Sequence, residues 1–490
     1  MNKIRLIMLL VFFGCFCVAG GSKNNKVEEI YFWQNVIYDD PPYHDDFLIG
    51  RYPYHIPENN DIIGLAYHAK SELMFASVGR FRPGVPSSLN AFCTSNYEIG
   101  TSPHIWGFPN YHKNTLKASF YGEFSYNIRT LSSSTSEYST GYYNYFFKRQ
   151  NETGLIRRRL SNNPQYYPNK LFNEFSIINV YHPTVDDRCN RLFVVDTGAL
   201  HYGPDEIYEI QNPALIVFQL NSYRIRSSNG CGSRDYPVVR RVEIPQNLWR
   251  DRVGFAFISL DHQPKGTCED IFVYITNVFD NSLTVYDYKR SSFWLIRDPS
   301  MNPVLGESKM VFNDNFHYDF VFGIKNIVLG WPDKNENRIA YFAPGASLGE
   351  YAVSTKFLKN PKKSLNSFAV KGEFTLIGYR GCDSQTFKQA IDPDTGVIFF
   401  GEIQSKRIRC WNTHLPLNSD TIGVVYRSDA LGFVSDIFID ADGYLWFHSS
   451  HLPIDFLTST PLDLDRINSR TFRVKATDAI KNTVCDLSSI

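Results

Sequence analysis

The chain has 490 residues, of which 43% are hydrophobic and 15% aromatic, so it can bury a large core. Its 50 Lys and Arg residues balance its 50 Asp and Glu residues, which excludes the basic excess typical of nucleic-acid-binding proteins. No segment approaches the roughly 20 continuous apolar residues that a membrane-spanning helix requires, so we predict no nucleic-acid or membrane partner.

The first twenty residues have the pattern of a secretory signal peptide. Lys3 and Arg5 precede an apolar stretch, Leu6 to Val18, and Ala19 to Gly21 supply small residues for cleavage. A signal anchor is the alternative, but the apolar stretch is short for one. We therefore predict that residues 1–20 are removed and that the mature protein is secreted to the extracellular space.

A short apolar strand that follows a polar or turn-forming segment recurs six times along the chain. The six strand cores are Leu73–Phe75, Leu192–Val194, Ile271–Val273, Ala340–Phe342, Ile398–Phe400 and Leu445–Phe447. Repetition at this spacing predicts an all-β domain, residues 29–475, in which small sheets are arranged radially and each packs only against its neighbours. Such a fold has a central channel surrounded by loops.

Other segments complete this domain. Glu29–Trp33 has the composition of a strand, and we expect it to complete the last sheet or to cover the first. Residues 131–173 are rich in Ser, Asn, Tyr and Arg and are predicted to form a long polar surface insertion. Residues 463–468 are predicted to form a single helical turn, and residues 476–490 a C-terminal tail.

Seven cysteines follow the predicted signal peptide, and most of them should pair in an oxidising compartment. They are Cys93, Cys189, Cys231, Cys268, Cys382, Cys410 and Cys485. Because seven is odd, at least one is expected to be free or bonded to another chain. None has the Cys-x-x-Cys or Cys/His spacing of a zinc site, so we predict no metal and no cofactor. Asn151, in the triplet Asn-Glu-Thr, is the predicted glycosylation site.

Seven stretches of the chain, in this order, resemble the Yellow and major royal jelly protein family of insects. They are Gly79–Leu89, Asp187–Gly198, Val239–Pro245, Leu283–Tyr288, Gly396–Gly401 continuing to Cys410–Thr413, Val434–Asp436 and Asp442–Trp446. The resemblance extends from Trp33 to about Arg473. It implies a six-bladed β-propeller, in agreement with the six repeats. It also implies several functions: cuticle or pigment proteins, dopachrome-converting enzymes, nutritive secreted proteins, and salivary proteins that bind biogenic amines in the central channel.

Two of these motifs also have structural explanations. The side chains of Asp196 and Thr197 are expected to form hydrogen bonds with neighbouring backbone groups, and Gly198 is expected to adopt a positive φ. An aspartic protease would instead need a second Asp beside Asp196, with which to share a proton. Cys410 is expected in a disulfide rather than as a nucleophile, because export favours pairing.

In the amine-binding members, the last-blade motif and the strand after it supply the ligand contacts. The corresponding positions in this chain are Ser435, Ser450 and Leu452. Most relatives carry Asn where Ser450 stands, and Leu452 replaces an aromatic residue. Amine binding is therefore disfavoured, since both the amide and the aromatic face are lost. Asp436 is a candidate carboxylate for a cationic ligand or a structural residue of the blade turn, and Asn277 is a candidate channel residue.

Three hypotheses of function follow. The first, which we favour, is a non-catalytic extracellular protein of cuticle, eggshell or pigmentation, with a small aromatic or amine ligand in its channel or matrix proteins as partners. The second is a dopachrome-converting enzyme of melanin synthesis, for which Asp436 and His451 are the candidate acid–base pair. The third is a calcium-dependent lactonase-like propeller, to which Asn277 and Asp436 would contribute oxygen ligands.

Overall fold

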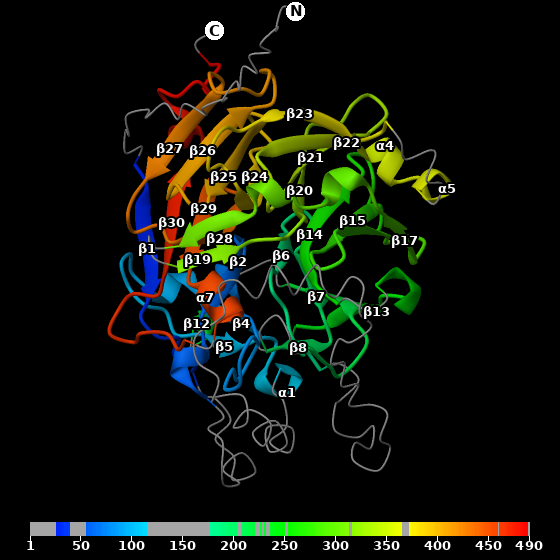
Figure 1. Cartoon of the computed structure of the whole chain (residues 1–490). Helices are drawn as coiled ribbons and strands as arrows, with labels where there is room; N and C mark the ends of the chain where they lie inside the picture. Colours follow the sequence, from blue (N-terminus) through cyan, green and yellow to red (C-terminus); the bar gives the residue numbers. More distant parts are fainter. Residues whose placement is uncertain are drawn as a thin grey trace, which may run out of the picture.

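Six four-stranded antiparallel sheets surround one axis in the computed structural model of the chain (Figure 1). The structure describes residues 26–39, 55–114, 176–202, 207–220, 226–227, 230–231, 236–249, 253–312, 316–364, 372–458 and 460–488. The predicted signal peptide, the insertion 131–173 and Asn151 lie outside these residues, as does the side chain of Cys231. Within the described ranges, the all-β class and the six-bladed propeller are confirmed.

The blades follow one another along the chain, each from its inner to its outer strand. Blade 1 contains β2 (Ile62–His68), β3 (Leu73–Val78), β4 (Leu89–Cys93) and β5 (Trp106–Gly107); blade 2 contains β6 (Thr184–Asp186), β7 (Arg191–Asp196), β10 (Ala214–Gln219) and β13 (Val238–Glu243). Blade 3 contains β14 (Phe255–His262), β15 (Ile271–Asn277), β16 (Ser282–Asp287) and β17 (Ser292–Ile296); blade 4 contains β20 (Ile324–Leu329), β21 (Ile339–Pro344), β22 (Gly349–Ser354) and β23 (Thr375–Tyr379). Blade 5 contains β24 (Thr386–Ile391), β25 (Val397–Glu402), β26 (Arg407–Asn412) and β27 (Ile422–Arg427); blade 6 contains β28 (Phe433–Ile439), β29 (Tyr444–Ser450), β30 (Ser469–Lys475) and β1 (Glu28–Trp33).

Shorter elements connect or flank the blades. They are the pairs β8 (Ala199–His201) with β9 (Ile207–Glu209), β11 (Arg226–Ser227) with β12 (Gly230–Cys231) and β18 (Lys309–Phe312) with β19 (Phe316–Asp319), and the helices α1 (Tyr111–Asn114), α4 (Thr355–Leu358), α5 (Pro361–Ser364), α7 (Leu452–Leu457) and α8 (Ala476–Ile480). Residues 463–468 form a turn rather than the predicted helical turn. The Asp463 carboxylate accepts a hydrogen bond from the Asp465 backbone N–H at 3.1 Å, a local bond that competes with helix formation.

The ring closes through its first and last strands. The inner strands β2, β6, β14, β20, β24 and β28 each contact the next, and β28 contacts β2. On the outside of blade 6, β1 pairs with β30 in a register that places Trp33 opposite Ser469. The prediction that the N-terminal strand completes the last blade is therefore confirmed.

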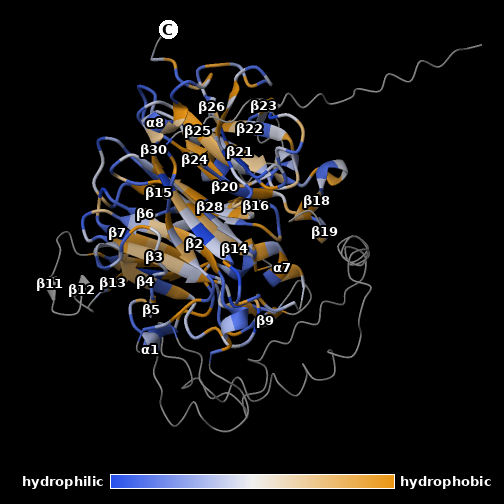
Figure 2. Cartoon of the chain, turned by 90° about the vertical axis from the view of Figure 1, so that its left-hand side faces the viewer, coloured by the Kyte–Doolittle hydropathy of each residue, from blue (hydrophilic) through white to orange (hydrophobic). Residues whose placement is uncertain are grey.

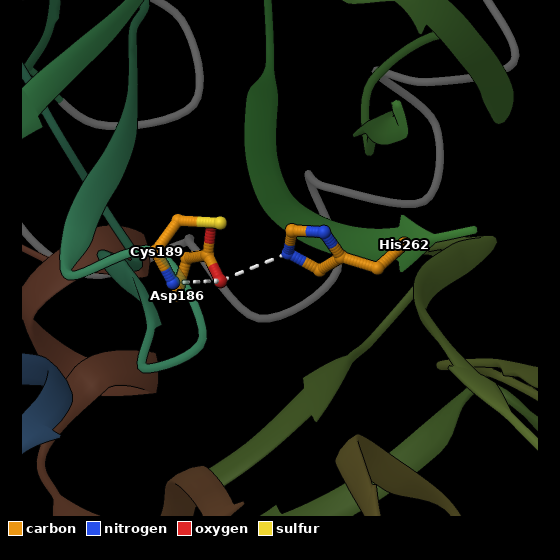
Figure 3. A group of neighbouring side chains, drawn as sticks. All are labelled: Asp186, Cys189 and His262. Carbon is orange, nitrogen blue, oxygen red and sulfur yellow. Dashed lines mark hydrogen bonds and ion pairs between the residues drawn. The ribbon is translucent and has the colours of Figure 1, made fainter. Parts of the chain in front are cut away.

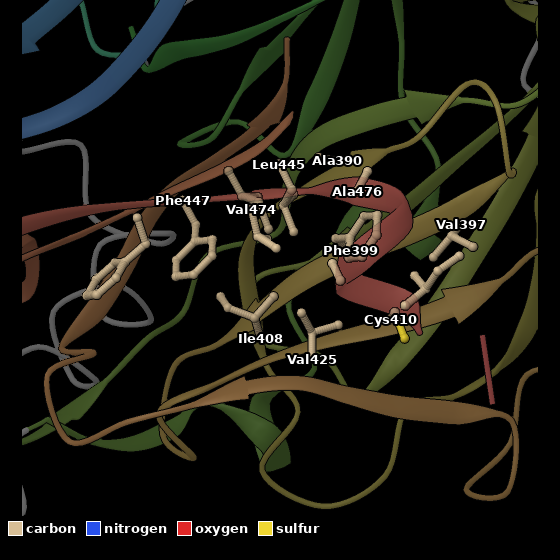
Figure 4. Packing of buried hydrophobic residues seen from close by; sticks show 14 of the residues in the cluster. Ala390, Val397, Phe399, Ile408, Cys410, Val425, Leu445, Phe447, Val474 and Ala476 are labelled. Carbon is tan, nitrogen blue, oxygen red and sulfur yellow. The ribbon is translucent and has the colours of Figure 1, made fainter. Parts of the chain in front are cut away.

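Hydrophobic layers between neighbouring blades form the core. Figure 2 shows the hydrophobic strands inside the molecule and the hydrophilic residues mainly in the loops and turns. Phe399 and Ile408 of blade 5 pack against Leu445 and Phe447 of blade 6, in one buried cluster with Ala476 of α8 (Figure 4). All six residues of β25 are buried, because each blade is covered on both faces. The predicted strand cores therefore correspond to the second strand of each blade.

Two disulfides fix segments that lie far apart in the sequence. Cys189 bonds to Cys268, which links the turn after β6 to the loop before β15. Cys410 of β26 bonds to Cys485, which ties the C-terminal residues to blade 5 and confirms the structural role predicted for Cys410. Cys93 and Cys382 are also disulfide-bonded. The expectation that at least one cysteine is free or bonded to another chain stays a prediction.

The Asp196-Thr197-Gly198 motif has the structural role that its residues predict. The Asp196 carboxylate accepts hydrogen bonds from the backbone N–H groups of Ile178, Asn179 and Gly198 at 2.8–3.0 Å. Gly198 has a φ of +66°, and a Cβ there would collide with the Gln211 carbonyl. A second such triplet, Asp394-Thr395-Gly396, lies in the turn before β25, in the blade on the opposite side of the ring. The two Asp residues therefore do not form a protease pair.

Candidate functional site

A cavity lies on the propeller axis, where the inner strands converge. The space between its walls is about 590 Å³, and this figure includes the part that is open to solvent. Its lining residues are mostly aromatic or aliphatic: Ile63, Phe81, Tyr181, His182, Ala256, Phe257, Val278, Phe279, Phe320, Phe322, Lys325, Phe387, Phe433, Leu452, Pro453, Phe456 and Leu457. They include no carboxylate. Strands β2, β14, β20, β24 and β28 each contribute, as does helix α7.

Asp436, on β28, is the centre of a buried polar cluster beside this cavity. Its carboxylate is fully buried and accepts hydrogen bonds from the Leu65 backbone N–H at 2.9 Å and from His182 Nδ1 at 3.1 Å. Its other oxygen forms an ion pair with Lys388 Nζ. Burial alone would raise the pKa of Asp436, but Lys388 and His182 hold it below its usual value. Asp436 is thus an ion whose charge is already compensated.

His182 extends from this cluster to the cavity wall. Its ring stacks on Phe257 with 4.2 Å between ring centroids. Because Nδ1 faces an ionised carboxylate, it carries the proton, and Nε2 is the unprotonated nitrogen. Burial lowers the pKa of His182 to about 4, although Asp436 opposes that shift. The imidazole is therefore neutral at pH 7 and available as a proton acceptor.

Lys325, on β20, supplies the amine of the cavity wall. The residue is 3% exposed, and Nζ lies 3.9 Å from the ring centroid of Phe322, 4.8 Å from that of Phe387 and 5.1 Å from that of Phe320. Within the described part of the chain, Nζ has neither a hydrogen bond nor an ion pair. Burial lowers the pKa of Lys325 well below its usual value, and the phenyl faces offset only part of the lost hydration.

The candidate residues named from the sequence occupy different places. Leu452 lines the cavity. Ser435 is buried on β28, and its hydroxyl has no hydrogen-bond partner among the described residues. The Ser450 hydroxyl accepts a hydrogen bond from the Leu452 backbone N–H at 3.3 Å, and Asn277 Oδ1 accepts one from the Phe279 N–H at 3.2 Å. Ser450 and Asn277 therefore shape the backbone beside the cavity.

His451 is not the imidazole that contacts Asp436. Its backbone N–H donates to Asp61 at 2.7 Å, and its Nδ1 bonds to the Asn468 carbonyl at 2.6 Å, next to the start of α7. The structure brings Asp436 together with His182 and Lys388 instead. Neither of these two residues was singled out from the sequence, nor was Lys325.

Helix α7 is held over the axis by an arginine and a pair of buried acids. Arg82 donates hydrogen bonds to the Ile454, Thr458 and Thr460 carbonyls at 2.6–3.2 Å. Asp61 and Asp455 interact directly, and burial followed by the Asp455 charge raises the pKa of Asp61 well above its usual value. Among the described residues, Asp61 Oδ1 and both oxygens of Asp455 have no hydrogen-bond donor, and Arg82 forms an ion pair with Asp455 Oδ1 at 4.0 Å. A proton shared between the two carboxyl groups satisfies this arrangement.

This acid pair makes stability depend on pH. The pKa of Asp61 is higher in the folded than in the unfolded chain, so its stabilising contribution is complete below about pH 4 and is lost as pH rises through the folded value. Asp61→Asn removes that titration, while Arg82 and His451 remain. We expect its Tm to rise relative to the unsubstituted protein by about 2 °C or more between pH 5 and pH 9, measured by calorimetry. Asp429→Asn, at an exposed turn, removes one carboxylate away from this pair and serves as the control. If the Tm of Asp61→Asn and the Tm of the unsubstituted protein changed equally with pH, the shared proton would be contradicted.

One group of side chains away from the axis has the spacing of metal ligands. Donor atoms of Asp186, Cys189 and His262 lie within 4.8 Å of one another (Figure 3). The Cys189 sulfur is bonded to Cys268, however, so it is not a thiolate. The remaining contact is the Asp186–His262 pair at 2.8 Å. At the axis, Asp436 is already paired, so neither place offers the unpaired carboxylates that calcium requires.

Comparison with known proteins agrees with this architecture. The family model described as major royal jelly protein matches residues 178–485. The chain belongs to the Yellow and major royal jelly protein family. Yellow-related salivary protein ASP2 of Phlebotomus orientalis is 31% identical over 464 residues, which are 94% of this chain and 95% of that protein.

Other Yellow relatives match a shorter part of the chain. Yellow-related salivary proteins M10 of Phlebotomus duboscqi and SP03 of Phlebotomus perniciosus are 35% and 37% identical, covering 63% and 64% of this chain and 73% and 75% of their own. A solved protein of unknown function from Bacteroides thetaiotaomicron superposes with a TM-score of 0.41 and 9% identity, covering 91% of this chain and 76% of its own. The predicted family is confirmed. No helix of the described residues is long and apolar enough to cross a membrane.

Proposed function

We propose that this Yellow-family protein is secreted and binds one small aromatic molecule, neutral or anionic, in its axial cavity. The observation that carries the proposal is the composition of the cavity wall: aromatic rings surround the buried amine of Lys325, and none of the described lining residues is a carboxylate. The signal-like N-terminus, the disulfides and the salivary names of the relatives support secretion. Cuticle, eggshell or pigmentation remains the proposed setting.

The charges disfavour a cationic ligand such as a biogenic amine. An ammonium ion in this cavity would find no carboxylate among the described lining residues, and Asp436, beside the cavity, already pairs with Lys388. Burying an ion without a partner is costly. An anionic ligand would instead favour protonation of Lys325 and pair with the resulting ammonium, and a neutral aromatic ring needs only the phenyl faces.

Three ligands that differ mainly in charge test this proposal. We expect 3-methylindole and indole-3-acetate to bind, and tryptamine to bind at least tenfold more weakly, as measured by titration calorimetry at pH 7. Ala256→Leu reduces the cavity and should weaken binding, whereas Ala441→Leu, at an exposed turn, should not. Equal affinity for tryptamine would reject the charge argument, and no binding of any ligand would reject the cavity as a site.

A dopachrome-converting activity is the second candidate, because one observation favours it. His182 lines the cavity, and its Nδ1–H is oriented by Asp436, an arrangement that suits a general base. In this proposal Nε2 would remove a proton from a quinone-like ligand and return it at another atom. Turnover of dopachrome would then fall about 100-fold or more in His182→Gln. No turnover by the unsubstituted protein would leave the binding function alone.

A further inference from the structure

We infer that Lys325 forms a reversible imine with the carbonyl group of an aromatic aldehyde held in the axial cavity. The inference rests on the proposed cavity binding and adds to it the chemical class of the ligand and the atom that bonds to it.

The geometry around Lys325 is that of a nucleophile rather than of a structural ion. Its side chain lines the cavity, and its Nζ lies among the rings of Phe320, Phe322 and Phe387. No described carboxylate or carbonyl holds it in place, in contrast to Lys388, which lies on the same side of the ring and pairs with Asp436. A structural lysine would have such a partner, since burying an unpaired ammonium is costly.

The same surroundings favour the reactive form of the amine. Desolvation lowers the pKa of Lys325, so a larger fraction of the side chain is the neutral amine with a free electron pair. An unperturbed lysine, with a pKa of about 10.4, is neutral in only about one molecule in ten thousand at pH 6.5. The phenyl rings add selectivity, because they place an aromatic aldehyde beside the nitrogen.

The chemistry needs no oxidant, reductant or cofactor. The Nζ electron pair attacks the carbonyl carbon, a C–N bond forms, and one proton moves from nitrogen to oxygen to give a carbinolamine. The C–O bond then breaks, the hydroxyl leaves as water after protonation, and the second N–H proton departs as the C=N bond forms. One water molecule is released for each imine. His182, the neutral imidazole of the same wall, can accept the departing proton.

Reductive trapping with benzaldehyde tests the inference. The whole secreted chain is incubated at pH 6.5 with benzaldehyde and cyanoborohydride, which converts an imine into a stable benzyl amine, and the modified peptide is identified by mass spectrometry. We expect benzylation at Lys325 at least tenfold faster than at any exposed lysine. Lys325→Met should abolish it, whereas Lys289→Met, at a side chain that is 62% exposed, should leave it unchanged.

Benzyl alcohol serves as the non-covalent control. It has the shape of benzaldehyde without the carbonyl, and its binding to the unsubstituted protein and to Lys325→Met shows whether the cavity is intact. Binding of benzyl alcohol without benzylation of Lys325 would overturn the imine and leave the cavity proposal standing. Benzylation spread over exposed lysines with none at Lys325 would also overturn it. If benzyl alcohol does not bind, both proposals fail.

Discussion

Asp436→Asn is expected to lower the free energy of unfolding by about 3–5 kcal/mol, the usual cost of removing one partner of a buried ion pair. Asp436 joins four parts of the ring: its own strand β28, Leu65 of β2, Lys388 of β24 and His182 beside β6. The substitution leaves the Lys388 ammonium without its anion. It also replaces one acceptor oxygen by an amide N–H₂, which cannot accept.

Urea denaturation of the purified protein measures this effect. Asp442→Asn is the matched control, because Asp442 lies in an exposed turn of the same blade and should change stability by less than about 0.5 kcal/mol. A change below about 1 kcal/mol for Asp436→Asn would show that the cluster does not hold the ring together. In that case Asp436 would again be a candidate ligand carboxylate.

Phe399→Ala is expected to destabilise the protein by about 3–5 kcal/mol. Phe399 is fully buried on β25, in the cluster that joins blades 5 and 6 (Figure 4). Truncation leaves a cavity between two sheets whose strands are fixed by hydrogen bonds, so the neighbours close it only in part. The Cys410–Cys485 disulfide lies at the edge of the same cluster and limits relaxation further.

Ile99→Ala serves as the control for that measurement. Ile99 is 61% exposed, so its truncation removes little buried surface, and we expect a loss below about 1 kcal/mol. Equal losses for the two variants would show that the layer between blades 5 and 6 adds little to stability. The free energies of unfolding of Phe399→Ala and Ile99→Ala are both measured by urea denaturation.

The blade count was predictable because the second strand of each blade is covered on both sides by its neighbours. Ile398 to Phe400 is apolar throughout for this reason, and such runs stand out in a sequence. The inner strands are harder to recognise, since they combine residues that face the axis with residues that face a blade. Lys325 and Asn326 interrupt an apolar run that extends from Val321 to the end of β20 at Leu329. That interruption was the available signal for the buried amine.

The candidate site was predictable only in part, because the ring brings together residues that are far apart along the chain. Asp436 was named from its motif, but His182 lies 254 positions away, and no local spacing relates the two. Proximity in sequence favoured His451 instead, whose side chain is engaged by the Asn468 carbonyl. The Gly79–Leu89 motif shows the same limit: its Arg82 holds α7, from the other end of the chain.

The pairing of β1 with β30 also dictates the order in which the ring can be completed. Strand β1 is synthesised before the other described strands, and the edge that pairs with β30 stays unpaired until β30 has been made. Because this closing contact joins opposite ends of the chain, it makes folding slow and keeps that edge open to association with other chains. A chain truncated before β30 would therefore leave the ring open. Any fusion placed at Glu28 would interfere with the pairing of β1, which closes the propeller.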